Sequence, residues 1–212
     1  MNKGLFITFE GCDGCGKTSV IQALSIELQK AGITPLVTRE PGGSLIAEEI
    51  RNIILDKKNT MMDPRTEALL YAASRRQHLA EIVLPALKEG KIVISDRYLD
   101  SSLAYQGYAR NIGIDAVYSI NAFAIDDTMP DITFFLDVRP EVALKRIAQN
   151  RDESEINRLD LEKLEFHNKV YDAYLLLLKK FPERIVRIDA SKTIEEEVKE
   201  IKNIISCKMK TC

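Results

Sequence analysis

Five short apolar runs are spaced along the chain, and longer segments with helical periodicity separate them. The runs cover residues 5–9, 35–38, 92–95, 132–137 and 185–188. Each is nearly continuous rather than alternating, as expected for strands that are buried on both faces of a sheet. The segments between them cover residues 17–31, 44–57, 64–89, 99–125, 140–150, 160–181 and 193–206. Strands that alternate with helices predict an α/β fold built on a parallel sheet.

Local signals mark several helix ends within this pattern. Asp63 is a candidate N-cap followed by Pro64 at the first helical position, and Thr193 with Glu196 has the spacing of a capping box. No repeat, low-complexity tract or linker divides the chain, so we expect a single domain over residues 1–212. The segment 149–160 is polar and weakly periodic, which predicts a mobile excursion from this domain.

Composition narrows the class of protein. The chain has 212 residues, 45% of them hydrophobic and 29% charged, and its net charge is −2. This balance gives no overall attraction to nucleic acid or to an anionic membrane. The longest apolar runs, 68–73 and 173–178, are far shorter than the ~20 residues of a membrane span, and no signal peptide precedes the first strand. We therefore expect a cytoplasmic protein that binds neither nucleic acid nor membrane.

The strongest motif lies between the first predicted strand and the first predicted helix. It matches G-x-x-x-x-G-K-[ST] in full and reads Gly11-Cys12-Asp13-Gly14-Cys15-Gly16-Lys17-Thr18. The glycines let main-chain N–H groups surround a phosphate, and the helix N-terminus adds positive potential. Lys17 is predicted to reach the β- and γ-phosphates, and Thr18 to bind Mg²⁺. The motif therefore predicts a binding site for a nucleoside triphosphate over all eight residues.

Two weaker motifs would indicate other functions, namely metal binding and guanine binding, but no further residues along the chain support either of them. Cys12 and Cys15 form C-x-x-C, yet a zinc site needs two further ligands, and Cys207 and Cys212 do not supply a matching pair. Residues 168–172 resemble the guanine-binding N-K-x-D motif with one residue too many. We interpret the cysteines as small loop residues and this segment as the solvated face of a helix.

Charged residues at strand ends suggest where a phosphoryl acceptor binds. Arg39 and Arg97 follow the second and third predicted strands, at the carboxyl ends where open α/β sheets bind ligands. Two guanidinium groups there could hold an acceptor phosphate, although surface arginines are usually solvated. Asp96 and Asp137 each end a strand and are candidates to orient Mg²⁺. We favour Asp96 because Arg97 beside it would link metal and acceptor.

An aromatic ring and a guanidinium share one face of the predicted helix over 64–89. Tyr71 and Arg75 have i, i+4 spacing, so together they could stack on a base and bond to its edge. Such pairs more often serve in packing and as a surface charge.

Several blocks of sequence, in order, resemble the thymidylate kinase family over nearly the whole chain. They are Phe9-Glu10-Gly11-x-Asp13-Gly14-x-Gly16-Lys17-Thr18, Thr38-Arg39-Glu40-Pro41-Gly42-Gly43, Leu70-Tyr71-Ala72-Ala73-Ser74-Arg75, Asp96-Arg97-Tyr98 and Ser101-Ser102-Leu103-Ala104-Tyr105-Gln106-Gly107. The resemblance implies ATP-dependent phosphorylation of dTMP to dTDP, the step before dTTP. It also implies the P-loop nucleoside-monophosphate kinase fold, a five-stranded parallel sheet surrounded by helices in three layers, and a homodimer.

The same resemblance implies roles for individual residues. It assigns Arg39 and Arg97 to the acceptor phosphate and Asp13 to the acceptor sugar and phosphate. Tyr71, where the family often has phenylalanine, would stack on thymine, and Tyr105 would pack near the sugar carbon that lacks a hydroxyl. The residues assigned to the edge of the base are Arg75, Ser102 and Gln106.

The segment 149–160 corresponds to the lid that closes over ATP in this family. Some members carry an arginine within the P-loop, where this chain has Asp13 and Gly14, so the resemblance to bacterial-type members shifts that role to Arg151 and Arg158 in the lid. An arginine supplied on closure can contribute ~10³-fold or more to phosphoryl transfer. The alternative for each is a solvated charged helix.

Three other functions stay open on the sequence alone. The chain could be a kinase of another nucleotide or nucleoside, although paired arginines suit an acceptor that already carries a phosphate. It could be a P-loop switch or regulatory ATPase, which would hydrolyse ATP without an acceptor. It could also be a structural protein that binds nucleic acid, against which the near-neutral charge argues.

Overall fold

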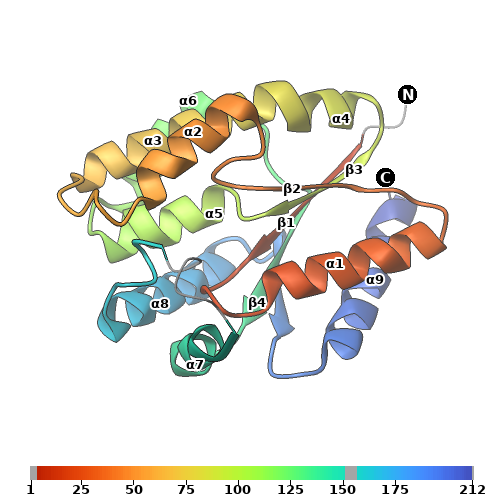
Figure 1. Cartoon of the computed structure of the whole chain (residues 1–212). Coiled ribbons are helices and arrows are strands. Elements are labelled where there is room, and N and C mark those ends of the chain that lie inside the picture. The colour runs from red at the N-terminus through yellow and green to blue at the C-terminus, as the bar shows by residue number, and fades with distance from the viewer. Residues whose placement is uncertain (1–3, 151–156, 212) are drawn as a thin grey trace.

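Five parallel strands form one sheet in the order β2-β3-β1-β4-β5 (Figure 1). The computed structural model describes residues 4–150 and 157–211. The strands are β1 (Leu5–Glu10), β2 (Leu36–Arg39), β3 (Ile92–Asp96), β4 (Ile132–Asp137) and β5 (Ile185–Asp189). The predicted apolar runs match them to within one residue at each end. The prediction of a parallel α/β sheet is therefore confirmed.

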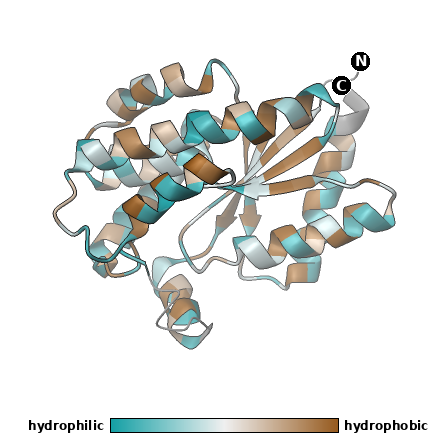
Figure 2. Cartoon of the chain, turned by 45° about the horizontal axis from the view of Figure 1, so that its top comes forward, coloured by the Kyte–Doolittle hydropathy of each residue, from teal (hydrophilic) through white to brown (hydrophobic). Residues whose placement is uncertain are grey.

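The central strands are apolar because both of their faces are covered. Every residue of β1 and β4 is buried, and the rings of Phe9 and Phe134 lie 5.3 Å apart between these neighbours. Figure 2 shows strands that are mostly hydrophobic, surrounded by helices that carry both hydrophobic and polar residues. Since all five strands are parallel, their carboxyl ends share one edge of the sheet, where Phe9 pairs with Asp96 and Asp137 with Asp189.

Helices cover the two faces of the sheet unequally. They are α1 (Lys17–Lys30), α2 (Leu45–Leu55), α3 (Pro64–His78), α4 (Leu84–Lys88), α5 (Leu99–Ser102), α6 (Ile114–Ile125), α7 (Pro140–Asn150), α8 (Leu164–Lys180) and α9 (Ile194–Thr211). The connection from β1 to β2 crosses the sheet in the direction opposite to the later connections, so right-handed crossovers place α1 on the other face from α3, α4 and α6. Figure 1 shows this arrangement, with α9 packed beside α1. The three-layer prediction is thus confirmed.

The predicted helix ends are confirmed at two sites where a side chain caps the backbone. Asp63 accepts hydrogen bonds from the N–H groups of Arg65 and Thr66 at the start of α3. At α9, the N–H of Thr193 donates to Glu196 Oε2 at 3.0 Å, and the N–H of Glu196 donates to Thr193 Oγ1 at 3.3 Å. Among the described residues, no helix combines the length and the apolar character that crossing a bilayer requires.

Three of the predicted helices differ from those observed, one of them because α9 continues past 206 to Thr211. The segment 99–125 is not one helix: a π-helical stretch, Leu103–Ala109, follows α5, and the chain turns before α6 begins. The turn ends at Gly113, whose φ of 103° favours glycine and whose N–H donates to Gly107 O at 2.8 Å. The helix predicted over 160–181 begins only at Leu164. The stretch 64–89 is helical throughout, with a π-helical turn at Leu79–Val83.

Candidate active site

The phosphate loop joins β1 to α1 at the carboxyl edge of the sheet. Gly11, Gly14 and Gly16 have φ values of 139°, 79° and 100°, which side chains rarely adopt. A Cβ on Gly14 would also overlap the carbonyl oxygen of Ala143 in α7. The glycines of the motif are therefore required by the path of the backbone.

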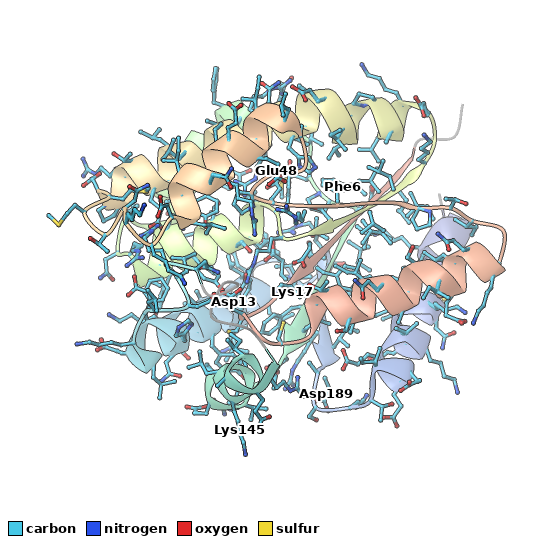
Figure 3. All side chains as sticks on the ribbon, in the orientation of Figure 1. Phe6, Asp13, Lys17, Glu48, Lys145 and Asp189 are labelled. Carbon is cyan, nitrogen blue, oxygen red and sulfur yellow. The ribbon has the colours of Figure 1, made fainter. Side chains whose placement is uncertain are left out.

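The side chain of Lys17 lies within this loop. Its Nζ donates to Gly11 O at 3.1 Å and to Cys12 O at 3.0 Å, and Lys17 and Asp13 lie together near the end of β1 (Figure 3). The loop and Lys17 line a cleft of about 1820 Å³. The far side of the cleft is formed by the start of α9 and by Arg146 of α7.

Thr18 and Asp96 come together beside Lys17, as the sequence predicted for the Mg²⁺ ligands. Thr18 Oγ1 donates to Asp96 Oδ2 at 3.3 Å, and both residues line the cleft. Two hard oxygen donors beside a phosphate site fit Mg²⁺, which usually takes one or two protein ligands and phosphate oxygens. No group of three or more His, Cys, Asp or Glu side chains in residues 4–150 and 157–211 could hold a metal. Asp137, the other candidate, is bound instead by Arg187 Nε at 2.5 Å.

A smaller pocket of about 440 Å³ adjoins the cleft. Both cavities are lined by Asp13, Glu40, Arg51, Arg97 and Asn157. The smaller pocket adds side chains from α3 and from the π-helical stretch that follows α5: Tyr71, Tyr105 and Gln106. A molecule bound in the smaller pocket would therefore contact, at these shared residues, a second molecule bound by the phosphate loop.

Arg97 lies at the junction of the two cavities. Its φ is 72°, an uncommon value for arginine, and it turns the chain away from β3. One guanidinium nitrogen donates to Asp13 Oδ1 at 2.9 Å, and the other donates to Ser101 Oγ at 2.9 Å. Tyr105 OH donates to Asp13 Oδ2 at 2.9 Å. The structure thus brings together Asp13, Arg97 and Tyr105, three residues to which the family resemblance assigns the acceptor.

A buried carboxylate, Glu10, holds several residues around this junction in place. It accepts hydrogen bonds from the N–H of Tyr98 at 2.8 Å, from Ser101 Oγ at 2.6 Å and from Tyr174 OH at 2.8 Å. Burial, with nearby Asp100, raises the pKa of Glu10 to about 7, although the Arg97 charge opposes the shift. Glu10 directly precedes the phosphate-loop motif, but its position at the end of a strand gave no sign of this role.

Two further arginines of the larger cleft come from β2 and α2. Arg39 is 47% exposed at its side chain, donates to Glu48 Oε2 at 3.1 Å and lines only the larger cleft. Arg51, which the sequence analysis missed, lines both cavities and donates to Pro41 O at 2.8 Å. Its burial and the neighbouring Arg39 lower the pKa of Arg51. The i, i+4 spacing of Arg51 from buried Ala47 was the available signal.

The residues predicted to bind a base divide into two layers. Tyr71 and Gln106 line the pocket, whereas Arg75 and Ser102 lie buried behind it. Arg75 donates from Nε to Glu40 Oε2 at 2.7 Å and from NH1 to Ser102 Oγ at 3.2 Å. Arg75 is therefore not the solvated charge that helix pairs usually provide.

Only part of the predicted lid falls within the described residues. Arg151 lies outside them. Arg158 is buried rather than solvated: its Nε donates to Ile54 O at 3.0 Å, and its NH2 pairs with Glu67 Oε2 at 2.5 Å. Asn157 next to it lines both cavities. Arg158 thus lies against α2 and α3, and it is not among the residues that line the phosphate cleft.

A phosphate loop at the carboxyl edge of a parallel sheet, with a second pocket opening beside it, defines a P-loop phosphotransferase. The family model described as Thymidylate kinase matches residues 9–201 of the chain. The chain therefore belongs to the thymidylate kinase family, whose members are phosphotransferases that use ATP to phosphorylate dTMP to dTDP.

Individual relatives agree over nearly the whole length. A thymidylate kinase of Clostridium novyi (strain NT) is 58% identical over 205 residues, covering 97% of this chain and 100% of the relative. One from Bacillus velezensis is 59% identical over 203 residues, covering 96% and 95%. The crystal structure of thymidylate kinase from Ehrlichia chaffeensis superposes with a TM-score of 0.77 at 33% identity, over 96% of this chain and 99% of that one.

Proposed function

We propose that this chain transfers the γ-phosphoryl group of Mg·ATP to dTMP and forms dTDP, the step before dTTP. The observation that carries the proposal is the junction at Asp13 and Arg97, where the phosphate cleft and the smaller pocket meet. Phosphoryl transfer depends mainly on positioning and charge neutralisation. Arg51 and Arg97 would supply both, because they line both cavities.

The donor side is formed by the phosphate loop. Main-chain N–H groups of residues 11–18 would surround the β- and γ-phosphates of ATP, and Lys17 would stabilise charge on the transferred group. Mg²⁺, held from Thr18 and Asp96, would neutralise phosphate charge when bound. Asp96 and Arg97 are adjacent in the sequence. The backbone turn after β3 therefore fixes the position of the proposed Mg²⁺ ligand relative to the arginine that would bind the acceptor.

The acceptor side is formed by the smaller pocket. Arg97, Arg39 and Arg51 would bind the phosphate of dTMP, since all three line the cleft next to the loop. Tyr71 would stack on thymine and Gln106 would bond to its edge, with Arg75 and Ser102 behind them. Tyr105, bonded to Asp13, would lie against the 2′ carbon and disfavour ribose.

We further propose that the protein forms a homodimer and that it acts in the cytoplasm. Its substrates there would be ATP and dTMP. Three neighbouring helices expose large apolar side chains: Ile53 of α2 is 50% exposed, Leu69 of α3 is 55% exposed and Phe123 of α6 is 91% exposed. Burial of such side chains against a second copy would be favourable.

The test of the function measures ADP formation from Mg·ATP with a panel of acceptors: dTMP, dUMP, dCMP, dGMP, dAMP, UMP and thymidine, with a control that contains no acceptor. We expect selective turnover with dTMP. Preference for another acceptor would leave the phosphate loop in place and overturn the assignments of Tyr71, Tyr105 and Gln106. Equal ADP formation without an acceptor would indicate an ATPase.

A further inference from the structure

A buried carboxylate, Glu67, lies behind the base-binding side of the smaller pocket, and no step of the proposed phosphoryl transfer uses it. Glu67 belongs to α3 and is 1% exposed. Its Oε2 pairs with Arg158 NH2 at 2.5 Å and lies 3.6 Å from Arg110 NH2. Its Oε1 accepts a hydrogen bond from Gln106 Nε2 at 2.8 Å. Arg158 thus compensates the buried charge, which would otherwise be costly, and Arg110, whose NH2 lies closer to Glu162 Oε1 at 2.6 Å, adds a second positive charge nearby.

This pairing fixes which way the amide of Gln106 faces. An ionised carboxylate has only acceptors, whereas a glutamine amide has a donor side and an acceptor side. Gln106 must therefore turn its NH2 group toward Glu67. Its Oε1 has no hydrogen-bond partner within the described part of the chain, and Gln106 lines the pocket together with Tyr71 and Tyr105. Gln106 Oε1 is consequently available as a hydrogen-bond acceptor for a molecule in the pocket.

We propose that Glu67 is a positioning residue for base selection, which holds the Gln106 oxygen toward the substrate so that it accepts a ring N–H. The inference rests on the proposed function. Thymine carries such an N–H at ring position 3, whereas cytosine has a lone pair there. Two acceptors facing each other in a buried pocket leave both without a partner, which is unfavourable. Glu67 therefore favours dTMP over dCMP without touching either.

Glu67→Gln tests the idea because it should reverse the amide of Gln106. In the variant, Arg158 and Arg110 can only donate, so they attract the new amide oxygen at position 67. Its NH2 group then faces Gln106, which must turn its oxygen inward and present NH2 to the pocket. We expect the ratio of kcat/KM for dTMP to kcat/KM for dCMP to fall by about 10-fold or more.

Glu67→Met is the matched variant, since it has similar length and no polar group. It removes the hydrogen bond to the Gln106 amide and favours neither orientation of that amide. The ratio of kcat/KM for dTMP to kcat/KM for dCMP should therefore lie between the ratios of the wild type and Glu67→Gln. A structural role alone would lower both kcat/KM values together. An unchanged ratio in both variants would therefore overturn the proposal.

A measurement on the unaltered protein keeps the test valid if neither variant folds. The side-chain amide protons of Gln106, assigned by NMR from the signal lost in Gln106→Met, should exchange slowly with solvent because they bind buried Glu67. Fast exchange would overturn the proposed orientation. Slow exchange in a protein that does not phosphorylate dTMP would support the orientation and reject the proposed function, so the two failures are distinguishable.

Discussion

Lys17 is held by the loop that it is proposed to serve, since its Nζ donates to Gly11 O and Cys12 O. We predict that Lys17→Ala lowers kcat by at least about 10²-fold, because charge on the transferred group loses its main stabilising cation. Steady-state ADP formation with dTMP measures the effect. Lys30→Ala, at the exposed far end of α1, is the control and should keep kcat unchanged. Full activity of Lys17→Ala would contradict the phosphate-loop mechanism.

Glu10 makes the stability of the fold depend on pH. Its pKa is raised from 4.5 to about 7, so the folded chain binds this proton more tightly than the unfolded chain. The resulting stabilisation is fully present below about pH 4.5 and is lost as the pH rises through about 7. We predict that the free energy of unfolding of the wild type, relative to Glu10→Gln, falls by on the order of 1–3 kcal/mol between pH 5 and pH 8.

Denaturant unfolding of both proteins at pH 5, 6, 7 and 8 measures this difference. Glu197, whose pKa burial also raises to about 7, is present in both proteins and cancels in the comparison. A difference that stays constant across the four pH values would show that Glu10 does not titrate in this range.

At the scale of elements, the two arginines of the lid segment can be distinguished by their effects on kcat and on the free energy of unfolding. We predict that at least one of the variants Arg151→Ala and Arg158→Ala lowers kcat by about 10³-fold, as expected for an arginine that stabilises phosphoryl transfer. Arg158→Ala should also lower the free energy of unfolding by about 3 kcal/mol, because buried Glu67 loses its closest cation. Steady-state kinetics and denaturant unfolding measure the two effects. An unchanged kcat in both variants would contradict the lid assignment.

The strands could be predicted from the sequence better than the helix boundaries. Continuous apolar runs identify β1 and β4 because burial on both faces requires them. The interruption at Gly113 was missed because the residues on either side of it remain apolar and compatible with a helix. Its N–H instead bonds to Gly107 O, a contact that arises only once the chain turns.

For the site, the sequence predicted the residues that carry a local motif and missed those defined by tertiary contacts. The glycines and Lys17 follow from the spacing of the phosphate loop. Glu10, Arg51 and Glu67 do not, because each acquires its surroundings from segments far away in the sequence. Glu67 illustrates the difference: it meets Gln106 and Arg158, which are 39 and 91 residues distant.

At the scale of the whole molecule, the apolar side chains exposed on α2, α3 and α6 predict self-association. We expect the wild type to sediment with twice the mass of the 24.0 kDa chain at micromolar concentration, and Phe123→Glu to shift it toward monomer by placing a charge in the interface. Ile26→Glu is the matched control, because Ile26 is exposed on α1 across the sheet. A monomeric wild type, or a Phe123→Glu protein that stays dimeric, would contradict this interface.

One feature of α3 bears on how the substrate range of this enzyme can change during evolution. Glu67, Tyr71, Arg75 and His78 are all buried and recur about once per helical turn, so a single helix carries Tyr71, which lines the pocket, together with the buried side chains near it. Replacing any one of them changes the contacts of that side chain and leaves the spacing of the others intact. Inserting or deleting a residue between them would rotate part of the set by about 100° and remove several contacts at once. Divergence in acceptor preference should therefore proceed by side-chain replacement within a helix of constant length.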